Sequence, residues 1–290
     1  MMAKVRVPGS CGELVQGSID GSNFLITCPI DFYTEVTVET EGQMINAGPK
    51  TVEAVRRTRA LLGAPDELFS VSTRSDLPQG KGMASSSADI SAACQATALS
   101  MGKMLSSDEI ADLALSIEPT DGIFYPGIVL FDHVRGTVRK SLGDVPPMSI
   151  VVFDIGGQVD TQEFNSRQDL SALNKAKEPQ IRQAVELVTR GLAEGDCTLI
   201  GQGATLSAMA NQRILFKPCL PTVIDVALEF GAVGVNVAHS GTVIGCLFAG
   251  EPAEPMEECV AAVRLACPGI EYIRTVRLIS GGLTVLEAPR

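Results

Sequence analysis

The stretch with the clearest chemical content is LPQGKGMASSSADISAAC, residues 77–94, where a glycine-containing loop runs into an alanine-rich segment. The first amide groups of a helix have no intrahelical partner and carry the positive end of its dipole, so they attract anions. Gly80 and Gly82 would let the backbone approach a phosphate closely, and Ser85, Ser86 and Ser87 supply hydroxyls that can cap the helix, contact phosphate or bind Mg²⁺. The pattern favours a polyphosphate cradle. An ordinary turn followed by a serine N-cap is the alternative, which explains only one of the serines.

This loop differs from two common nucleotide-binding loops. Ser75 stands where a Walker A loop has its first glycine, and Gly82 rather than Ser or Thr follows Lys81. The G-x-G-x-x-G pattern of a Rossmann turn fails at Ser85. Neither loop class therefore accounts for the segment.

The segment PQGKGMASSSADISAA, residues 78–93, resembles the second motif of the GHMP kinase superfamily, Pro-x-x-x-Gly-Leu-Gly-Ser-Ser-Ala-Ala. Met83 stands in place of the family leucine, Ala84 in place of the second glycine, and Ser87 in place of the first alanine. PGSCGELVQG, residues 8–17, is similar to the first motif, and GAVGVNVAHSGTVIG, residues 231–245, is similar to the third. Four segments most resemble the L-threonine kinase branch of this superfamily, which serves cobalamin synthesis: SCGELVQG, CPIDFYTEV, EPTDGI and AHSGTVIG.

The resemblance implies an α+β protein with the GHMP kinase fold. A ribosomal-S5-like, nucleotide-binding N-terminal domain would occupy residues 1–145 and a ferredoxin-like C-terminal domain residues 146–290, with ATP between them. The implied reaction is ATP- and Mg²⁺-dependent phosphorylation of L-threonine to O-phospho-L-threonine for the aminopropanol linker of cobalamin. Another small-alcohol kinase such as homoserine kinase, or a non-catalytic sensor that binds a nucleotide or small molecule, stays open as an alternative.

Three residues are the candidates for catalysis. By family position Ser86 and Glu118 would bind Mg²⁺, and Asp121 would act as general base or orient the acceptor hydroxyl. Glu118 follows a predicted helix, where a carboxylate opposes the dipole, so a ligand role is favoured over a solvated surface charge. An Asx-turn before Gly122 is nearly as good an explanation of Asp121. The family lysine of the first motif is missing, because Ser10 follows Pro8-Gly9.

The other candidate residues divide into nucleotide and acceptor contacts. The residues implied to hold the nucleotide are Pro78, Gly80, Lys81, Gly82, Met83, Ala84, Ser85, Ser86 and Ser87, of which Ser87 is better explained as an N-cap or a small packing residue. The residues proposed to hold the amino acid are Glu13, Gln16 and Asp31 for its ammonium, Asp154, Gly156 and Gly157 for its carboxylate, and Ser240, Gly241 and Thr242 as lining. For Asp31 a turn after Pro29 is an equal alternative. His239 is expected to position other groups only.

The sequence predicts both strands and helices to position these candidate residues. Alternation and β-branching predict strands over residues 4–7, 32–40, 68–76, 127–134, 148–154, 232–237, 242–248, 270–279 and 283–286. Helices are predicted over residues 52–62, 87–101, 107–117, 180–193, 198–210, 223–230 and 256–265. Ser106 and Glu109 fit a capping box before the third of these helices. GDVPPM, residues 143–148, is a plausible domain boundary.

The amino-acid composition limits the classes of molecule that this protein is expected to bind. The formal net charge is −11, which disfavours nucleic acid and anionic membrane surfaces, so an anionic ligand must be held by local dipoles. Eight cysteines without a C-x-x-C pair predict reduced, mostly buried thiols, and the N-terminus lacks the apolar run of a secretory signal. We therefore expect a cytoplasmic protein that binds small molecules. Its oligomeric state is open, with a homodimer as one option.

Overall fold

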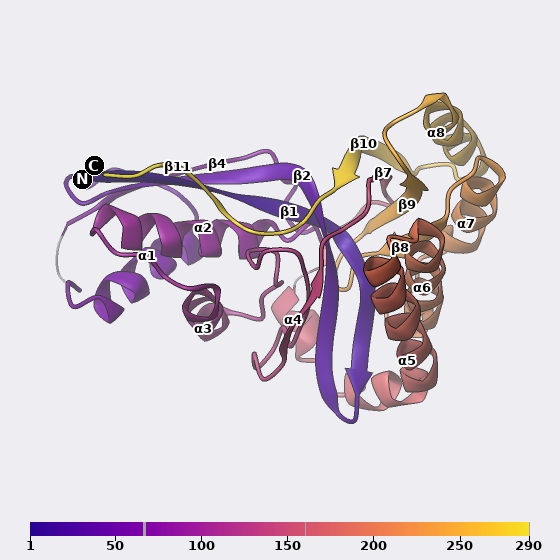
Figure 1. Ribbon diagram of the computed structural model, residues 1–290, viewed down its shortest axis with the longest axis horizontal. Helices are drawn as coiled ribbons and strands as arrows, with labels where there is room; N and C mark the ends of the chain where they lie inside the picture. Colours follow the sequence, from indigo (N-terminus) through magenta and orange to yellow (C-terminus); the bar gives the residue numbers. More distant parts are fainter. Residues whose placement is uncertain (66–67, 160, 290) are drawn as a thin grey trace.

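The computed structural model describes residues 1–65, 68–159 and 161–289. Its central feature is a long antiparallel hairpin of β1 (Met2–Ile19) and β2 (Ser22–Glu39), which runs through the whole molecule (Figure 1). The turn between them places Asp20 and Gly21 at φ 51° and 78°, the left-handed backbone that tight hairpin turns require. The register shifts after Pro8, Ser10 and Glu13, so the first motif lies where the hairpin is most irregular.

Strands on both sides of the hairpin and three helices below it form the N-terminal half. The strands are β3 (Ile45–Asn46), β4 (Ser70–Ser75), β5 (Ile128–Phe131), β6 (Arg139–Gly143) and the C-terminal β11 (Thr284–Glu287). The helices are α1 (Pro49–Leu61), α2 (Ser85–Ser100) and α3 (Ser107–Ile117). β4 pairs with β2 and β11 pairs with β1, which brings the two chain termini together (Figure 1).

Helix α2 is the core element of this half. Thirteen of its 16 residues are buried, because small side chains on every face let α1, α3 and the hairpin approach closely. Its buried hydroxyls are satisfied within the helix: Ser91, Thr97 and Ser100 donate to backbone carbonyls at 2.6, 2.7 and 2.8 Å. Polar residues therefore sit inside the core without an unpaired group, and the start of α2 is held rigidly.

The C-terminal half has the expected ferredoxin-like order of elements. Its strands are β7 (Met148–Asp154), β8 (Gly234–Val237), β9 (Val243–Ala249) and β10 (Glu271–Leu278), arranged antiparallel in the order β8-β9-β7-β10. Its helices are α4 (Thr161–Asn165), α5 (Leu170–Glu194), α6 (Cys197–Ala210), a 3₁₀ turn (Asn211–Arg213), α7 (Leu220–Glu229) and α8 (Glu254–Ala266). With its intervening helices the sheet has the β-α-β-β-α-β pattern of a ferredoxin-like domain.

The two halves share strand pairing. Glu13 of β1 pairs with Val237 of β8, and Ile30 of β2 pairs with Leu278 of β10, so the hairpin joins both sheets. A division near residue 145 stays a prediction.

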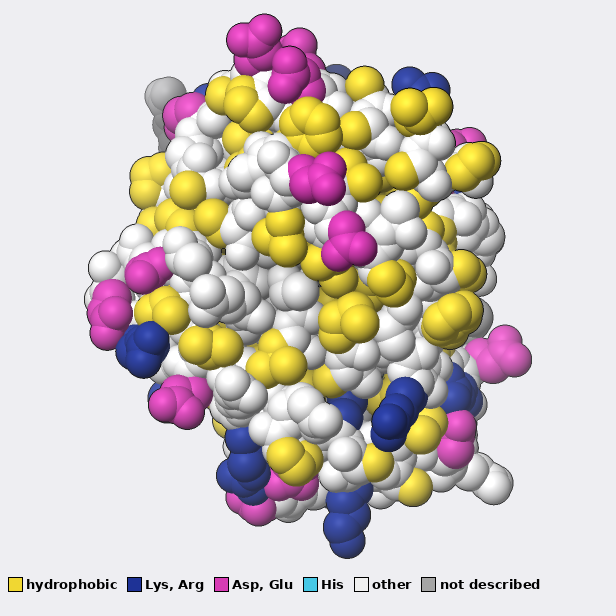
Figure 2. All heavy atoms as spheres, turned by 90° about the vertical axis from the view of Figure 1, so that its right-hand side faces the viewer, with side chains coloured by type: hydrophobic (Ala, Val, Ile, Leu, Met, Phe, Trp, Pro, Cys, Tyr) yellow, Lys and Arg dark blue, Asp and Glu magenta, His cyan; other side chains and the backbone are white. Residues whose placement is uncertain are grey.

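The face formed by the C-terminal helices shows hydrophobic side chains interspersed with acidic ones, and basic side chains gather toward its lower edge (Figure 2). Across the described ranges, no helix has the length and apolar character needed to cross a membrane.

Most predicted elements are confirmed, but several differ in extent, and β6 and α4 were not predicted. The strand predicted over residues 32–40 begins at Ser22. The strand predicted over residues 4–7 continues to Ile19, because pairing with β2 and β8 supports the glycine- and serine-containing first motif in extended form. The helix predicted from residue 87 begins at Ser85. The helix predicted from residue 180 begins ten residues earlier, at Leu170, and contains Pro179.

Candidate active site

The three motifs meet at the start of α2. Backbone amides of the first motif, Ser10 and Gly12, donate to the carbonyls of Met83 and Gly82 at 3.0 and 3.3 Å. The amide of Thr242 in the third motif donates to the carbonyl of Lys81 at 2.9 Å. The loop before α2 is therefore held between the hairpin and the β8–β9 connection.

Close backbone packing explains the glycines at this junction. A Cβ atom on Gly82 would lie 2.3 Å from the Cβ of Ala238, and one on Gly241 would lie 2.3 Å from the carbonyl oxygen of Lys81. Gly80 and Gly82 also have φ of 70° and 80°. The loop thus takes the shape of a cradle, with the first turn of α2 at its end.

The N-cap of α2 is Ala84, which corrects the expectation that Ser87 caps the helix. Ala84 has φ 55° and ψ 25°, the left-handed conformation that costs an L-residue about 1–2 kcal/mol. Because its methyl group cannot accept a hydrogen bond, the first amides of α2 are not capped by this side chain. The backbone conformation explains why the family motif has glycine at this position.

An Ala84→Gly variant should be more stable than the wild type by up to about 1 kcal/mol, because glycine removes the left-handed strain and loses part of that gain through the entropy of the unfolded chain. Thermal unfolding measures the change. As a control, Ala98→Gly within the same helix should lower stability, since Ala98 is helical and fully buried. A lower melting temperature for Ala84→Gly would contradict the strain argument.

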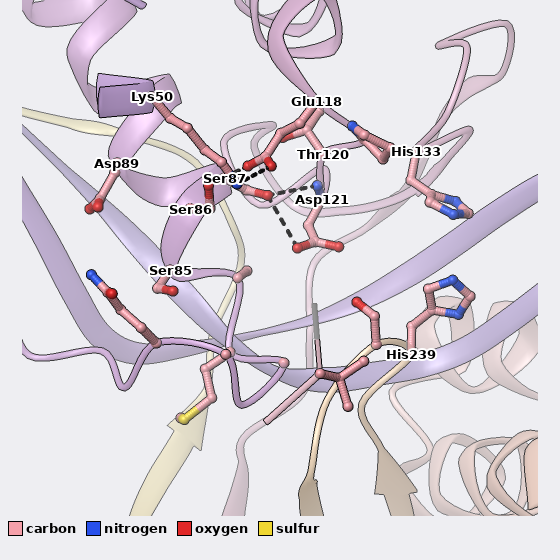
Figure 3. Close-up of a pocket in the computed structure, with 18 of the residues that line it drawn as sticks. Lys50, Ser85, Ser86, Ser87, Asp89, Glu118, Thr120, Asp121, His133 and His239 are labelled. Atoms are coloured by element: carbon pink, nitrogen blue, oxygen red, sulfur yellow. Dashed lines mark hydrogen bonds and ion pairs between the residues drawn. The ribbon is translucent and has the colours of Figure 1, made fainter. Parts of the chain in front are cut away.

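Two serine–carboxylate pairs follow the cradle (Figure 3). Ser86 donates to one oxygen of Glu118, and the ammonium of Lys50 forms an ion pair with the other oxygen. Ser87 donates to Asp121 Oδ2 at 3.2 Å and accepts from the Asp121 amide at 3.0 Å. Glu118 is the C-cap of α3, and its side chain is 2% exposed. The structure thus brings together Ser86, Glu118 and Asp121, the three residues predicted to be catalytic.

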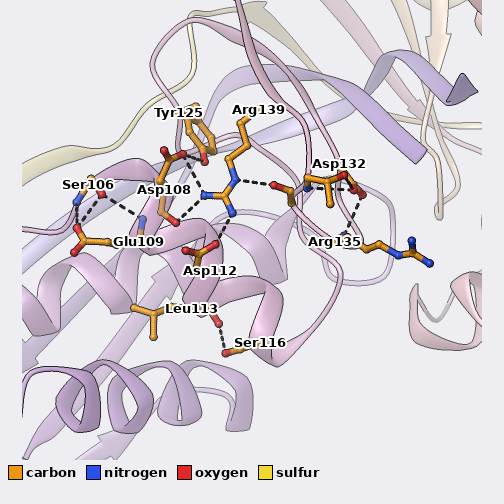
Figure 4. A network of polar contacts seen from close by, with 12 residues as sticks. Ser106, Asp108, Glu109, Asp112, Leu113, Ser116, Tyr125, Asp132, Arg135 and Arg139 are labelled. Atoms are coloured by element: carbon orange, nitrogen blue, oxygen red, sulfur yellow. Dashed lines mark hydrogen bonds and ion pairs between the residues drawn. The ribbon is translucent and has the colours of Figure 1, made fainter. Parts of the chain in front are cut away.

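A network of polar contacts ties α3, which precedes Glu118, to β6 and the neighbouring loops (Figure 4). The predicted capping box is present: the Glu109 amide donates to Ser106 Oγ at 3.3 Å, and the Ser106 amide donates to Glu109 at 2.7 Å. Arg139 of β6 bridges to Asp108 and Asp112 on α3. The amide of Thr120 donates to the carbonyl of His133 at 2.9 Å. The segment that carries Glu118 and Asp121 is therefore fixed at both ends.

The Asp121 carboxyl is suited to accept a proton. Burial raises its pKa to about 6, the hydrogen bond from Ser87 opposes that rise, and the Glu118 charge adds to it. A carboxylate with a pKa near neutrality is a stronger base than an exposed aspartate and is still ionised at pH 7. This property suits a group that receives a proton from an alcohol.

The donor set fits Mg²⁺ together with a nucleotide. Ser86 and Glu118 offer a hydroxyl and a carboxylate oxygen at one point, and these are the hard donors that Mg²⁺ takes. Among the described residues, no group of three or more His, Cys, Asp and Glu side chains could hold a metal ion. Mg²⁺ is commonly held by one or two protein ligands and completed by phosphate oxygens and water. Ser86 and Glu118 fit this small protein share of a Mg²⁺ site.

A cavity of about 660 Å³ contains these groups. The N-terminal turns of α1 and α2 line it, together with the segment from Glu118 to Asp121, both histidines and Ser240. Two helix N-termini facing one cavity supply partial positive charge to an anion. The cavity has room for a nucleotide phosphate chain and a small acceptor.

The predicted acceptor residues do not all reach this cavity. Ser240 lines it, whereas Gly241 and Thr242 use their backbone to support the loop before α2. Asp31 lies on β2 and accepts from the backbone amide of Arg277 at 2.8 Å, so it serves the pairing of β2 with β10. Asp31 lies within a strand rather than in a turn, and its carboxylate contacts the neighbouring strand, so neither the turn after Pro29 nor the ligand contact is found.

Asp154, Gly156 and Gly157 bind a lysine of the protein. Lys81 forms an ion pair with Asp154 at 2.5 Å and donates to the Gly157 carbonyl at 2.8 Å. The Gly156 amide, which we expected to hold a substrate carboxylate, donates to Asp154 Oδ1 at 3.1 Å. Burial would raise the pKa of Asp154, but Lys81, Thr242 and the Gly156 amide outweigh burial and keep it below its ordinary value. These residues therefore anchor the side chain of Lys81.

Glu13 and Gln16 on β1 are both buried. Burial and the charge of Asp121 raise the pKa of Glu13 well above its ordinary value, so in the absence of a neighbouring cation the protonated form of this carboxyl is favoured. Gln16 donates to the Val237 carbonyl at 3.1 Å, and its amide oxygen lies 3.0 Å from Nδ1 of His239. Gln16 thus fixes the orientation of His239 at the cavity wall.

Among the lining residues that sequence reasoning missed are Lys50, Asp89, His133 and Asn165. Lys50 and Asp89 belong to helices whose patterns indicated only packing. The rings of His133 and His239 lie edge to face with centroids 5.0 Å apart, although the residues are 106 positions apart in the chain. Burial lowers the pKa of His133 to about 4, so this histidine is neutral at pH 7. Only their low number in the chain could have marked the histidines for attention.

Comparison with known proteins agrees with this site and fold. A family model for the GHMP kinases N terminal domain matches residues 50–125, and a model for the GHMP kinases C terminal domain matches residues 174–268. The chain belongs to the GHMP kinase family and is a small-molecule kinase. The expected GHMP kinase fold is thereby confirmed.

Two of the similar proteins carry the same name, L-threonine kinase. The chain is 36% identical over 249 residues to an L-threonine kinase of Salmonella typhimurium, covering 85% of this chain and 83% of that protein. It is 33% identical over 249 residues to an L-threonine kinase of Citrobacter freundii, covering 85% and 86%. A homoserine kinase structure from Cytophaga hutchinsonii matches with a TM-score of 0.71 over 98% of this chain and 97% of that one, at 18% identity. This last similarity concerns the fold alone.

Proposed function

We propose that this kinase transfers the γ-phosphoryl group of ATP to the side-chain hydroxyl of L-threonine and forms O-phospho-L-threonine. The observation that carries the proposal is the side-by-side placement of the Ser86–Glu118 and Ser87–Asp121 pairs at the start of α2. The two L-threonine kinases that the chain resembles support the choice of acceptor. We also propose that the product serves the aminopropanol linker of cobalamin.

Each group has one task in the proposed reaction. The cradle and the first amides of α2 bind the phosphates, which places the γ-phosphorus for in-line attack. Bound Mg²⁺, held by Ser86 and Glu118, would neutralise charge that builds up on the phosphate oxygens. Asp121 receives the proton of the acceptor hydroxyl as the new O–P bond forms and the bond to the ADP oxygen breaks. Ser87 keeps the Asp121 carboxylate oriented through the hydrogen bond between them.

The proposed location is the cytoplasm. All eight cysteines are free, and six of them are buried, which agrees with the prediction of mostly buried thiols. Burial raises the pKa of Cys11 and Cys28, so these thiols are poor nucleophiles. The proposed reaction therefore uses no cysteine as a nucleophile.

The test is ADP release with Mg·ATP and, in turn, L-threonine, L-serine and L-homoserine. We expect turnover with L-threonine, and a Ser86→Ala variant should lose about 10–10³-fold in kcat/KM because one oxygen donor near the phosphates is gone. Ser91→Ala, which removes a hydroxyl deeper in the same helix, should keep its activity. A preference for L-homoserine would mean that L-homoserine, and not L-threonine, is the acceptor. ATP binding without any turnover would favour the non-catalytic sensor.

A further inference from the structure

The charge of the cavity poses a problem for a polyanion. Its described lining carries four carboxylates, those of Asp89, Glu118, Asp121 and Glu163, and a single Lys or Arg side chain, that of Lys50. Burial lowers the pKa of both lining histidines, so neither contributes positive charge at pH 7. A nucleotide triphosphate needs neutralisation by fixed positive groups as well as by metal. Lys50 is the lining side chain that can supply a full positive charge.

The two other positions from which a lysine could serve the phosphates do not provide one. Ser10 stands where the first motif resembles a family segment with lysine, and this serine is 1% exposed. Lys81 lies in the loop itself, but its ammonium is held by Asp154 at 2.5 Å and by the Gly157 carbonyl at 2.8 Å. A cation must therefore come from another element.

Lys50 reaches the site from α1. It is the second residue of this helix, whose first turn lines the cavity together with that of α2. Its side chain is 45% exposed, whereas the Glu118 side chain that it contacts is 2% exposed. Lys50 and Glu118 thus reach toward one another from α1 and the end of α3 (Figure 3), and the lysine is the more exposed partner. A lysine has a flexible four-carbon stem and can move its charge to a new partner nearby.

We propose that Lys50 is the phosphate-binding cation of this kinase and that it changes partner when nucleotide binds. In the protein without nucleotide, Lys50 neutralises the buried carboxylate of Glu118. When Mg·ATP is bound, Glu118 has a metal ligand's role, and the Lys50 ammonium turns to the β- and γ-phosphate oxygens. The inference rests on the proposed use of ATP, and it assigns to α1 the charge that the first motif lacks.

The exchange of partners makes two opposite predictions for Lys50→Met. ATP at saturating Mg²⁺ should bind about 10–100-fold more weakly to the variant, since a charge-assisted contact to phosphate is lost. Mn²⁺ without nucleotide should bind more tightly than to the wild type, because the competing ammonium has left Glu118. Calorimetry measures the first quantity, and the paramagnetic signal of free Mn²⁺ measures the second. A residue that only supports the fold would weaken both.

Two variants complete the experiment. Lys50→Arg keeps the positive charge and should recover most of the ATP affinity, and Lys103→Met, which removes an exposed lysine after α2, should match the wild type in both assays. Unchanged ATP affinity in Lys50→Met would overturn the inference, as would weaker Mn²⁺ binding in a folded variant. If the two opposite shifts appear and L-threonine is not phosphorylated, the role of Lys50 stands and the proposed acceptor fails.

Discussion

An Asp121→Asn variant should bind Mg·ATP nearly as well as the wild type and lose about 10²–10⁴-fold in kcat. Asparagine keeps the shape of the side chain and its contact with Ser87, but it cannot take the proton of the acceptor hydroxyl. Initial rates of ADP release give kcat, and fluorescence of a labelled ATP analogue gives the affinity. Asp89→Asn removes another carboxylate from the same cavity and should keep most of its kcat.

The pH dependence of the wild type tests the same role. Because burial raises the pKa of Asp121 to about 6, the carboxylate is ionised above that pH and protonated below it. The kcat/KM for the acceptor should therefore be high at pH 7–8 and fall tenfold per unit well below pH 6. Asp121→Asn should lack this acidic limb. A small loss of kcat with an unchanged pH profile would mean that the phosphoryl transfer proceeds without a base.

A Gly241→Ala variant should lose about 1–3 kcal/mol of stability and bind nucleotide at least tenfold more weakly. The new Cβ would lie 2.3 Å from the Lys81 carbonyl oxygen and 2.4 Å from the Gly82 Cα. Both neighbours are backbone atoms, so the loop before α2 must shift as a unit and carry its phosphate-binding amides with it. Denaturant unfolding and ATP titration measure the two effects.

Gly191→Ala is the matched control for this clash. Its Cβ would lie 2.9 Å from the Asp196 carbonyl oxygen and 2.8 Å from a side-chain atom of Ile200, at the contact of α5 with α6. We expect a comparable loss of stability with normal nucleotide affinity in the folded protein. If both glycine variants bind ATP normally, the packing of the third motif does not shape the nucleotide loop.

Most of the fold could be predicted because its signals are local. The capping box of Ser106 and Glu109 acts across three residues, and the apolar spacing of α3 repeats within one helical turn. The length of β1 could not be predicted in the same way. Residues 8–17 have a composition typical of a loop, and they are extended because β2 and β8 pair with them from distant parts of the chain.

The candidate site shows the same division. Ser86, Glu118 and Asp121 were predicted from motif positions. In the structure Ser86 contacts Glu118, and the adjacent Ser87 contacts Asp121. Asp154 was expected to lie free for a substrate, yet it holds Lys81. Lys50 gave no signal at all, since its role depends on α1 pointing its first turn at the end of α3.

By itself the sequence determined most of the helices and strands and singled out the loop before α2, because capping, periodicity and left-handed glycines act over a few neighbouring residues. The tertiary structure alone decided which charged groups are free to act. A carboxylate or an ammonium takes its pKa and its partner from everything within a few ångströms, and in this protein those neighbours often come from distant segments: Lys81 and Gly157 are 76 residues apart, and Arg182 and Asp20 are 162 residues apart. The sequence therefore identified the chemistry, and the packing of α1, α3 and β7 around α2 selected the residues that are available to carry it out.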